Sequence, residues 1–219
     1  MRIVITGGAG FLASRLARRL LERGSLTDAR GGRRAIDKII LLDIAAPAAI
    51  DDARIVPIVG DLADATVVER AITADTDTVF HLAAVVSGQA EADFDIGMRV
   101  NLDATRGLLE RCRRLAAPPK FVFASSLAVF GGPLPDPVPD DAPLTPQASY
   151  GVQKAIGEML KRTDHKRAHW NVVPGDDKHY ARLAVVERVC EAVEAELTGR
   201  GFDLTEGAAE QPQTAEETA

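Results

Sequence analysis

Short hydrophobic runs recur along the first 125 residues and are separated by longer stretches of helical character. Five of these runs are rich in β-branched or aromatic residues; they span 2–6, 39–43, 54–59, 78–82 and 120–125. Because the runs are continuously apolar instead of alternating, they predict strands that are covered on both faces. Strands that alternate with helices pair in parallel through right-handed crossovers. The pattern therefore predicts an α/β doubly wound parallel sheet, a Rossmann fold, with the strand order 3-2-1-4-5.

A proline-rich segment separates the fifth predicted strand from the next helix. Six of the chain's 12 prolines fall between Pro133 and Pro146, which predicts a long and stiff loop. Long loops in compact domains are commonly lids or binding loops. We expect this segment to face a substrate, with a plain surface connection as the alternative.

The composition is that of an ordinary globular protein. The 219 residues, 46% of them hydrophobic and 26% charged, are enough to bury one substantial core. No apolar run approaches the ~18 to 20 residues that span a bilayer, and the N-terminal residues run into a glycine turn instead of a secretory segment. We therefore expect a cytoplasmic protein that does not interact with a membrane.

The chain shows no convincing set of metal ligands. Cys112 and Cys190 fall in segments of helical pattern, with no second cysteine or histidine at metal-ligand spacing. His165 and His169 are four residues apart but lack a third ligand nearby. We predict reduced core thiols, a solvated histidine pair and no metal site.

The formal net charge of -6 comes mostly from the C-terminal end. From Glu196 onward there are six acidic residues against Arg200 alone. The rest of the chain shows no basic patch, so no nucleic-acid partner is expected. Residues 204–219 lack the large apolar side chains that would offset the entropy of ordering, which predicts a disordered acidic tail.

A glycine turn links the first predicted strand to the first helix. A G-x-x-G-x-x-A frame starts at Gly7 and opens a helix whose expected apolar face is Phe11, Leu16 and Leu20. Glycines let the backbone turn tightly and approach a pyrophosphate, and the helix N-terminus offers it unpaired N–H groups. The turn predicts an NAD-binding site that includes Gly7, Gly10, Phe11 and Leu12.

Asp43 ends the second predicted strand. A carboxylate there can accept hydrogen bonds from both adenine-ribose hydroxyls and would repel a 2′-phosphate, which favours NAD over NADP. Asp43 follows Gly10 by 33 residues, more than the usual ~20, and the excess lies in a polar loop over 24–34. Arg33 and Arg34 in that loop leave a 2′-phosphate site open as the alternative.

Further cofactor contacts are expected after the third and fourth strands. Asp61 could accept from the adenine amino group, and the small side chain of Ala83 lets a cofactor lie close to the backbone. The residues predicted to bind NAD at these two strand ends are Asp61, Leu62, Leu82 and Ala83. His81 lies within an apolar run, so we predict a buried, hydrogen-bonded residue, with a base or ligand as the alternative.

Ser126 follows the fifth strand, and Tyr150 and Lys154 lie four residues apart on one helix face. A phenol has an ordinary pKa of about 10, which a nearby ammonium lowers. The constellation predicts Tyr150 as the base, Ser126 as a hydrogen-bond partner of the reacting oxygen, and Lys154 as the group that also holds the nicotinamide ribose.

These motifs resemble the extended short-chain dehydrogenase/reductase family, which includes nucleotide-sugar epimerases and dehydratases, over residues 1–160. The segments FHLAAVVSGQAEADFDIGMRVN and SSLAVFGGPLPD are similar to its D-erythronate dehydrogenase group. The resemblance implies NAD-dependent oxidation of a hydroxyl on a small sugar acid. It also implies that Asn101 helps to order the active site, and that the helices of Asn101 and Tyr150 form a homodimer. The sequence alone leaves a helix-surface amide as the alternative for Asn101.

Beyond Lys161 the sequence changes character. Residues 162–203 resemble the C-terminal end of class II polyphosphate kinases, without the phosphate-binding loop and catalytic acids that precede it there. The expected organisation is an NAD-binding Rossmann domain with Ser, Tyr and Lys over 1–161, a strand–helix extension on the sheet over 162–203, and the acidic tail. The resemblance implies that the substrate domain is largely missing, so alternatives to the oxidoreductase stay open. They are a truncated or chimeric module that binds NAD without catalysis, a nucleotide-sugar epimerase/dehydratase relative, and a nucleotide or polyphosphate handler that relies on residues 162–203.

Overall fold

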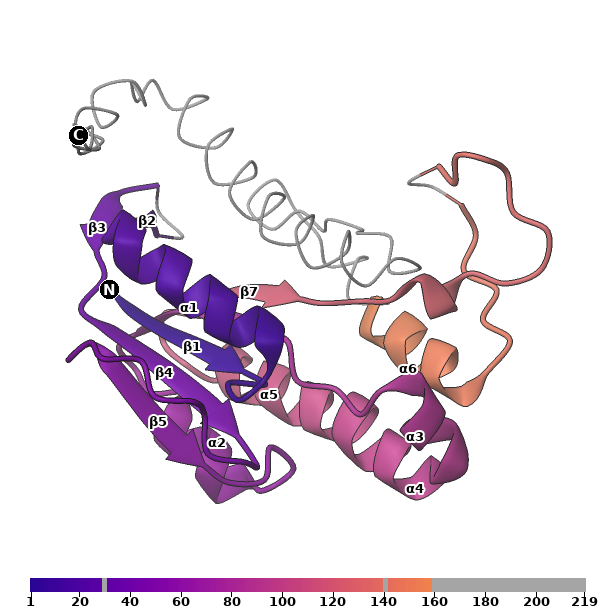
Figure 1. The fold of residues 1–219 in the computed structure, drawn as a ribbon, viewed down its shortest axis with the longest axis horizontal. Coiled ribbons are helices and arrows are strands. Elements are labelled where there is room, and N and C mark those ends of the chain that lie inside the picture. Colours follow the sequence, from indigo (N-terminus) through magenta and orange to yellow (C-terminus); the bar gives the residue numbers. More distant parts are fainter. Residues whose placement is uncertain (29–30, 140–141, 159–219) are drawn as a thin grey trace, which may run out of the picture.

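A five-stranded parallel sheet forms the centre of the computed structural model, which describes residues 1–28, 31–139 and 142–158 (Figure 1). Its spatial order is β5-β4-β1-β6-β7, and every pairing is parallel. The strands are β1 (Arg2–Thr6), β4 (Lys38–Asp43), β5 (Ile55–Val59), β6 (Thr76–His81) and β7 (Lys120–Phe123). Both the predicted sheet and its strand order are confirmed. The strand–helix extension and the acidic tail predicted for 162–219 lie outside the described residues.

Helices cover both faces of the sheet, as Figure 1 shows. The α-helices are α1 (Phe11–Arg23), α2 (Ala65–Ala71), α3 (Ser87–Ala92), α4 (Phe94–Gly97), α5 (Ala104–Arg113) and α6 (Ser149–Glu158). A π-helical turn, η1 (Met98–Asp103), connects α4 to α5, and a short 3₁₀ turn, η2 (Leu127–Val129), follows β7. Local capping sets two of the ends: Asp64 accepts from the Thr66 N–H at the start of α2, and Gly24 adopts a φ of +69° at the end of α1.

Two hydrophobic cores form because neighbouring residues of each central strand point to opposite faces. On one face, Ile40 and Leu42 of β4 pack in a cluster with Val67 of α2 and Leu108 of α5. On the other face, Ile39 of β4 joins a cluster with α1 and β1. The continuous hydrophobic runs of the sequence therefore correspond to strands buried on both sides.

The polar stretch 24–34 was expected to be a loop, and this expectation is wrong. Its described part forms an antiparallel hairpin of β2 (Ser25–Thr27) and β3 (Arg33–Ala35). The hairpin holds because Leu26 is buried in the core on the α1 side of the sheet, together with Ile36. The insertion between the glycine turn and Asp43 is thus a folded unit attached to that core.

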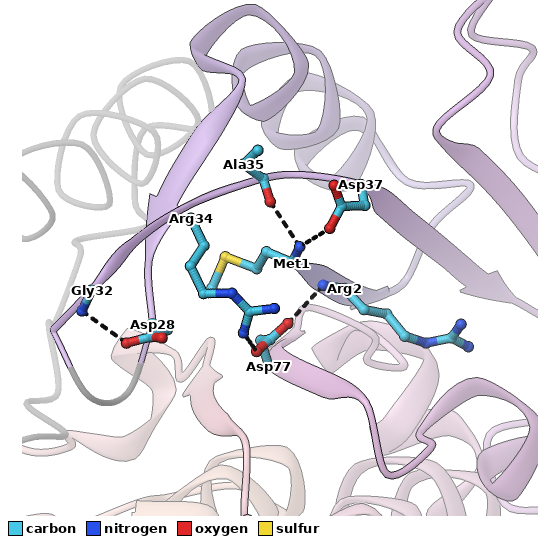
Figure 2. Close-up of polar contacts among 8 residues, drawn as sticks. All are labelled: Met1, Arg2, Asp28, Gly32, Arg34, Ala35, Asp37 and Asp77. Carbon is cyan, nitrogen blue, oxygen red and sulfur yellow. Dashed lines mark hydrogen bonds and ion pairs between the residues drawn. The ribbon is translucent and has the colours of Figure 1, made fainter.

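The hairpin is fixed to the amino edge of the sheet by charged groups (Figure 2). Arg34 pairs with Asp77 at the start of β6, and the backbone N–H of Arg2 donates to the same carboxylate at 2.8 Å. The ammonium group of Met1 donates to the carbonyl oxygen of Ala35 at 2.7 Å. These contacts place β3 at the end of the sheet where β1 and β6 begin.

The proline-rich segment projects from the sheet as a long loop (Figure 1), in agreement with the prediction from its composition. Its described residues between Phe130 and Ala148 contain no helix or strand. Thr145 closes the base of the loop: its N–H donates to Val129 O at 3.0 Å and its hydroxyl to Gly131 O at 2.8 Å. Gly131 is required there, because a Cβ would lie 2.4 Å from the Thr145 carbonyl oxygen. The substrate-facing role stays a prediction.

The structure also bears on the predictions about membranes, metal ions and cysteines. No helix in the described part of the chain is long and apolar enough to cross a bilayer, and the same residues contain no group of three or more His, Cys, Asp or Glu that could hold a metal ion. Burial raises the pKa of Cys112 to about 12, as expected for a core thiol. Cys190, His165 and His169 lie outside the described residues.

We expect Ile39→Ala and Ile40→Ala each to lower the free energy of unfolding by about 2–5 kcal/mol, because the two side chains fill opposite cores and each is at most 1% exposed. Val59→Ala is the control: this β5 residue is 52% exposed, so its truncation should change stability by about 0.5 kcal/mol or less. Denaturant unfolding of the three variants measures this. A small effect for either isoleucine would contradict a sheet buried on both faces.

Candidate active site

The predicted site residues gather where the parallel strands end, on the edge of the sheet opposite the hairpin. Gly7 directly follows β1 and has a φ of +74°, which favours glycine. A Cβ on Gly7 would lie 2.9 Å from the Ala83 nitrogen, so β1 and the segment after β6 can approach only because that side chain is absent. The turn is closed by a hydrogen bond from Gly10 N–H to Gly7 O at 2.8 Å.

The N-terminus of α1 opens onto this glycine turn. Gly10 caps the helix without any side-chain hydrogen bond, and the first turn contains no acidic residue. Unpaired N–H groups and the helix dipole make such an end favourable for an anion. The N-terminus of α1 is therefore chemically suited to bind the pyrophosphate of a dinucleotide.

Asp43 lies beside the same turn, at the end of β4. Its Oδ2 accepts from Ala9 N–H and its Oδ1 from Ala45 N–H, both at 3.0 Å. A carboxylate held next to an anion-binding helix end is in the place where ribose hydroxyls would donate to it. Asp43 therefore lies beside the glycine turn despite the long insertion before it, and its binding of the ribose stays a prediction.

Phe11 was expected on the buried face of α1, and this is wrong. Its side chain is 46% exposed, and the guanidinium of Arg15 lies 5.1 Å from the ring centroid. Phe11 is the first residue of the helix, whose buried face is formed by Ala13, Leu16, Ala17 and Leu20. Leu12 is half-buried.

The alternative of a 2′-phosphate site at Arg33 and Arg34 is contradicted. Arg34 pairs with Asp77 at the amino edge of the sheet (Figure 2), and Arg33 Nε donates to Ser25 Oγ at 2.8 Å within the hairpin. Asp43 lies at the opposite, carboxyl edge. Neither arginine is placed to bind a phosphate beside Asp43.

Asp61, after β5, is already engaged by the protein. Its carboxylate pairs with Arg99 of η1 and accepts from Ala63 N–H at 2.8 Å. The hydrogen bond from Arg99, followed by that from Ala63, lowers the pKa of Asp61. Sequence reasoning missed Arg99, because nothing local connects it to a residue 38 positions away. The neighbouring Leu62 packs into the core beside α2, and Leu82 and Ala83 are half-buried.

His81 is buried and hydrogen-bonded on both ring nitrogens, which confirms the sequence prediction. Its Nδ1 lies 2.7 Å from Thr6 Oγ1, and its Nε2 lies 2.8 Å from Thr105 Oγ1. The Thr105 hydroxyl donates its proton to Asn101 O and so accepts from Nε2–H. In the neutral ring Nδ1 is then an acceptor, and the Thr6 hydroxyl donates to it while accepting from Ala83 N–H. The pKa of His81 is lowered to about 3, with burial as the largest cause, so the ring is neutral.

Asn101 is 1% exposed and lies in the π-helical turn η1, so the helix-surface alternative is wrong. Its Oδ1 accepts from Val85 N–H at 2.9 Å, and its Nδ2 donates to Val85 O at 3.0 Å. The same Nδ2 donates to Gln153 Oε1 at 2.9 Å. The side chain thus holds the backbone that follows β6. π-Helical turns are frequent at functional sites.

Ser126, Tyr150 and Lys154 come together, as the sequence predicts. Ser126 precedes η2, and its Oγ accepts from Ala128 N–H at 3.2 Å. Lys154 is 3% exposed; its Nζ donates to Ala124 O at 3.0 Å and lies 5.9 Å from the centroid of the Tyr150 ring. The three side chains therefore share one region next to the end of β7.

The predicted lowering of the pKa of Tyr150 is not found. Burial raises the pKa of Tyr150, and a hydrogen bond with Ser126 acts in the opposite sense. Burial also lowers the pKa of Lys154 to about 8. Desolvation of the phenol therefore outweighs its hydrogen bond in setting the direction of the shift.

Two contacts that position α6 were missed from the sequence. Glu91 of α3 accepts hydrogen bonds from Ser149 Oγ and from Tyr150 N–H, both at 2.8 Å, where the helix begins. These hydrogen bonds lower the pKa of Glu91. At Gly151 a Cβ would lie 2.1 Å from Ala128 O, so only glycine lets α6 approach η2. Both contacts bring the start of α6 onto the segments that carry the other site residues.

The fold and the site together define a dinucleotide-binding Rossmann protein. More narrowly, the chain belongs to the NAD-dependent epimerase/dehydratase family, whose sequence profile matches residues 3–175. This confirms the predicted family, the Rossmann class and NAD as the cofactor of that family. The match extends past Lys161 to residue 175, and the division of the chain at that point stays a prediction.

Two curated relatives are D-erythronate dehydrogenases, which confirms the resemblance to that group. The enzyme of Cupriavidus necator is 61% identical over 160 residues, covering 73% of this chain and 49% of the relative. The enzyme of Haemophilus influenzae is 44% identical over 161 residues, with the same coverage of 73% and 49%. The chain therefore spans about half the length of these relatives.

Solved structures agree with this assignment. The nucleoside-diphosphate-sugar epimerase of Agrobacterium tumefaciens is 40% identical with a TM-score of 0.68, and the similarity covers 80% of this chain and 51% of that one. The enzyme WbmG of Bordetella bronchiseptica, solved in complex with NAD, is 27% identical with a TM-score of 0.61, covering 80% and 52%. Both likenesses confirm the fold class.

The buried His81 predicts a specific loss of stability in mild acid. Its pKa is about 3 in the folded protein and about 6.5 when unfolded, so its contribution is complete above pH 6.5 and decreases as the pH falls toward 3. Over that window the unfolded chain binds one more proton. Between pH 5.5 and 4.5 we expect the wild type to lose about 1.4 kcal/mol more stability than His81→Gln. Denaturant titrations measure both slopes, and equal slopes would contradict a neutral, buried His81.

Proposed function

We propose that this chain binds NAD at its glycine turn and oxidises a hydroxyl group of a small sugar acid such as D-erythronate. The observation that carries the proposal is the convergence of Tyr150, Lys154 and Ser126 at the sheet edge that also holds the glycine turn. Hydrogen bonds physically link the two regions: Asn101 contacts both Val85, which follows β6, and Gln153, on the helix of Tyr150 and Lys154.

The cradle for NAD is formed by the chain's own backbone. The N–H groups at the start of α1 would bind the pyrophosphate, and Asp43 would accept from the ribose hydroxyls. Other residues proposed to hold the cofactor are Gly7, Gly10, Phe11, Leu12, Asp61, Leu62, Leu82, Ala83, Tyr150 and Lys154. When bound, NAD supplies the acceptor for the hydride that leaves the substrate carbon.

Tyr150 is the proposed base, which takes the proton of the substrate hydroxyl onto its phenolic oxygen. The phenolate form of Tyr150 accepts the proton, and because burial raises the pKa of Tyr150, this form is populated at higher pH than in an exposed tyrosine. Ser126 would donate to or accept from the reacting oxygen, since its hydroxyl lies beside Tyr150. Lys154, held by Ala124 O, would contribute positive charge below its pKa of about 8.

The substrate class comes from the D-erythronate dehydrogenase relatives and not from a pocket in this chain. Because the chain spans about half of those proteins, the second candidate is an NAD-binding module without turnover. The homodimer through η1 and α6, the resemblance of 162–203 to polyphosphate kinases and the cytoplasmic location stay predictions.

Tyr150→Phe tests the chemistry. We expect kcat for the oxidation of D-erythronate to fall at least about 100-fold, because the phenolic oxygen is removed and the ring that packs in the site is kept. The Kd for NAD should change less than about twofold. NADH absorbance and calorimetry measure the two quantities. Near-normal turnover would refute Tyr150 as the base. Tight NAD binding by the wild type, with no NADH formed from a panel of sugar acids, would establish the non-catalytic module.

Gly10→Asp tests the cofactor cradle. A carboxylate at the start of α1 would repel the pyrophosphate, so the Kd for NAD should rise at least about tenfold. Folding should persist, because aspartate is a favourable N-cap residue. Gly107→Asp is the matched control: it adds the same charge on α5, where a Cβ meets nothing within 4 Å. If both variants bind NAD as the wild type does, the cofactor is held elsewhere.

A further inference from the structure

A buried carboxamide lies between the two residues proposed for catalysis on α6. Gln153 is 0% exposed, and its Oε1 accepts from Asn101 Nδ2 at 2.9 Å. Its Nε2 finds no hydrogen-bond partner among the residues that the structure describes. Neither the family membership nor the proposed mechanism assigns a role to this side chain.

The orientation of both amides follows from the backbone of Val85. Val85 N–H can only donate and Val85 O can only accept, so Asn101 must present Oδ1 to the first and Nδ2 to the second. The second proton of Asn101 Nδ2 then points to Gln153, which must offer its oxygen. The free Nε2 of Gln153 is therefore a consequence of the geometry and not an arbitrary choice.

Gln153 is also unfavourable for the fold alone. A buried donor without a partner costs about 1–3 kcal/mol. A methionine of similar length would fill the same space and remove this donor, but it would leave the second proton of Asn101 Nδ2 without an acceptor. The last residue of α4, Gly97, packs closely against the carboxamide: a Cβ there would lie 2.7 Å from Gln153 Nε2. The π-helical turn η1 starts at the next residue. The contribution of Gln153 must therefore come from the contact of its oxygen with Asn101.

We infer that Gln153 is a positioning residue: it holds Asn101 so that Asn101 fixes the backbone of Val85, and with it the segment 82–86. That segment touches the glycine turn at one end, through Ala83, and leads into α3 at the other, where Glu91 caps the helix of Tyr150. Gln153 thereby couples the helix of the proposed base to the backbone next to the cofactor cradle. The catalytic consequence of this coupling rests on the proposed function.

Gln153→Met in the 219-residue chain is the central test. It removes the unpartnered Nε2 but leaves one proton of Asn101 Nδ2 without an acceptor, so the two effects offset each other and thermal stability should stay close to that of the wild type. Amide hydrogen exchange of Val85 should become about fivefold faster, because Asn101 loses one of its restraints. For D-erythronate oxidation, kcat should fall about tenfold, with the Kd for NAD unchanged.

Two further variants separate positioning from packing. Gln153→Glu keeps an acceptor for Asn101 Nδ2 and should retain the slow exchange of Val85. Leu20→Met introduces the same side chain into the core on the α1 side of the sheet and should leave both Val85 exchange and kcat unchanged. In an Asn101→Ala background, Gln153→Met should have no additional effect on kcat, because the two residues act through one contact.

Each contrary result overturns the inference. Unchanged Val85 exchange in Gln153→Met would show that Gln153 does not restrain Asn101. An unfolded or strongly destabilised Gln153→Met would show that the residue mainly stabilises the fold. Additive effects on kcat in the Asn101→Ala background would show that Gln153 acts independently of Asn101. Hydrogen exchange needs neither NAD nor substrate, so an absence of turnover would refute the proposed function while Val85 exchange still decides the role of Gln153.

Discussion

A buried chain of hydrogen bonds holds the site together, and the other contacts depend on it. The chain runs from Ala83 N–H through Thr6, His81 and Thr105 to the carbonyl oxygen of Asn101. It joins the ends of β1 and β6 to the helical segment η1–α5. Every donor in this chain meets an acceptor when the imidazole is neutral and protonated on Nε2, and burial keeps the ring neutral because it lowers the pKa of His81.

The fold was predictable where local pattern and tertiary environment agree. Continuous apolar runs identified all five sheet strands, because a strand covered on both faces leaves no room for polar alternation. The β2–β3 hairpin was missed because its strands have three residues each and all three residues of β3 lie on the exposed surface. Phe11 was misplaced because helical spacing alone does not show that the first residue of α1 is exposed.

The sequence predicted which residue types come together in the site, but not how deeply their side chains are buried. The spacing of Tyr150 and Lys154 places both on one face of a helix, whatever the rest of the fold does. The pKa of Tyr150, in contrast, depends on burial by segments distant in sequence. Burial raises this pKa by more than the hydrogen bond with Ser126 lowers it. Gln153 and Glu91 gave no local signal, since their partners lie 52 and 58 or more residues away.

Burial acts in opposite directions on the two titratable groups of α6. It raises the pKa of Tyr150 and lowers that of Lys154 to about 8, so both groups are driven toward their uncharged forms. Keeping Lys154 charged at neutral pH costs about 3 kcal/mol relative to an exposed lysine. The two cores of the sheet offset that cost. The folded chain therefore fixes the geometry of the tyrosine and lysine, and burial of the same two groups opposes their ionisation.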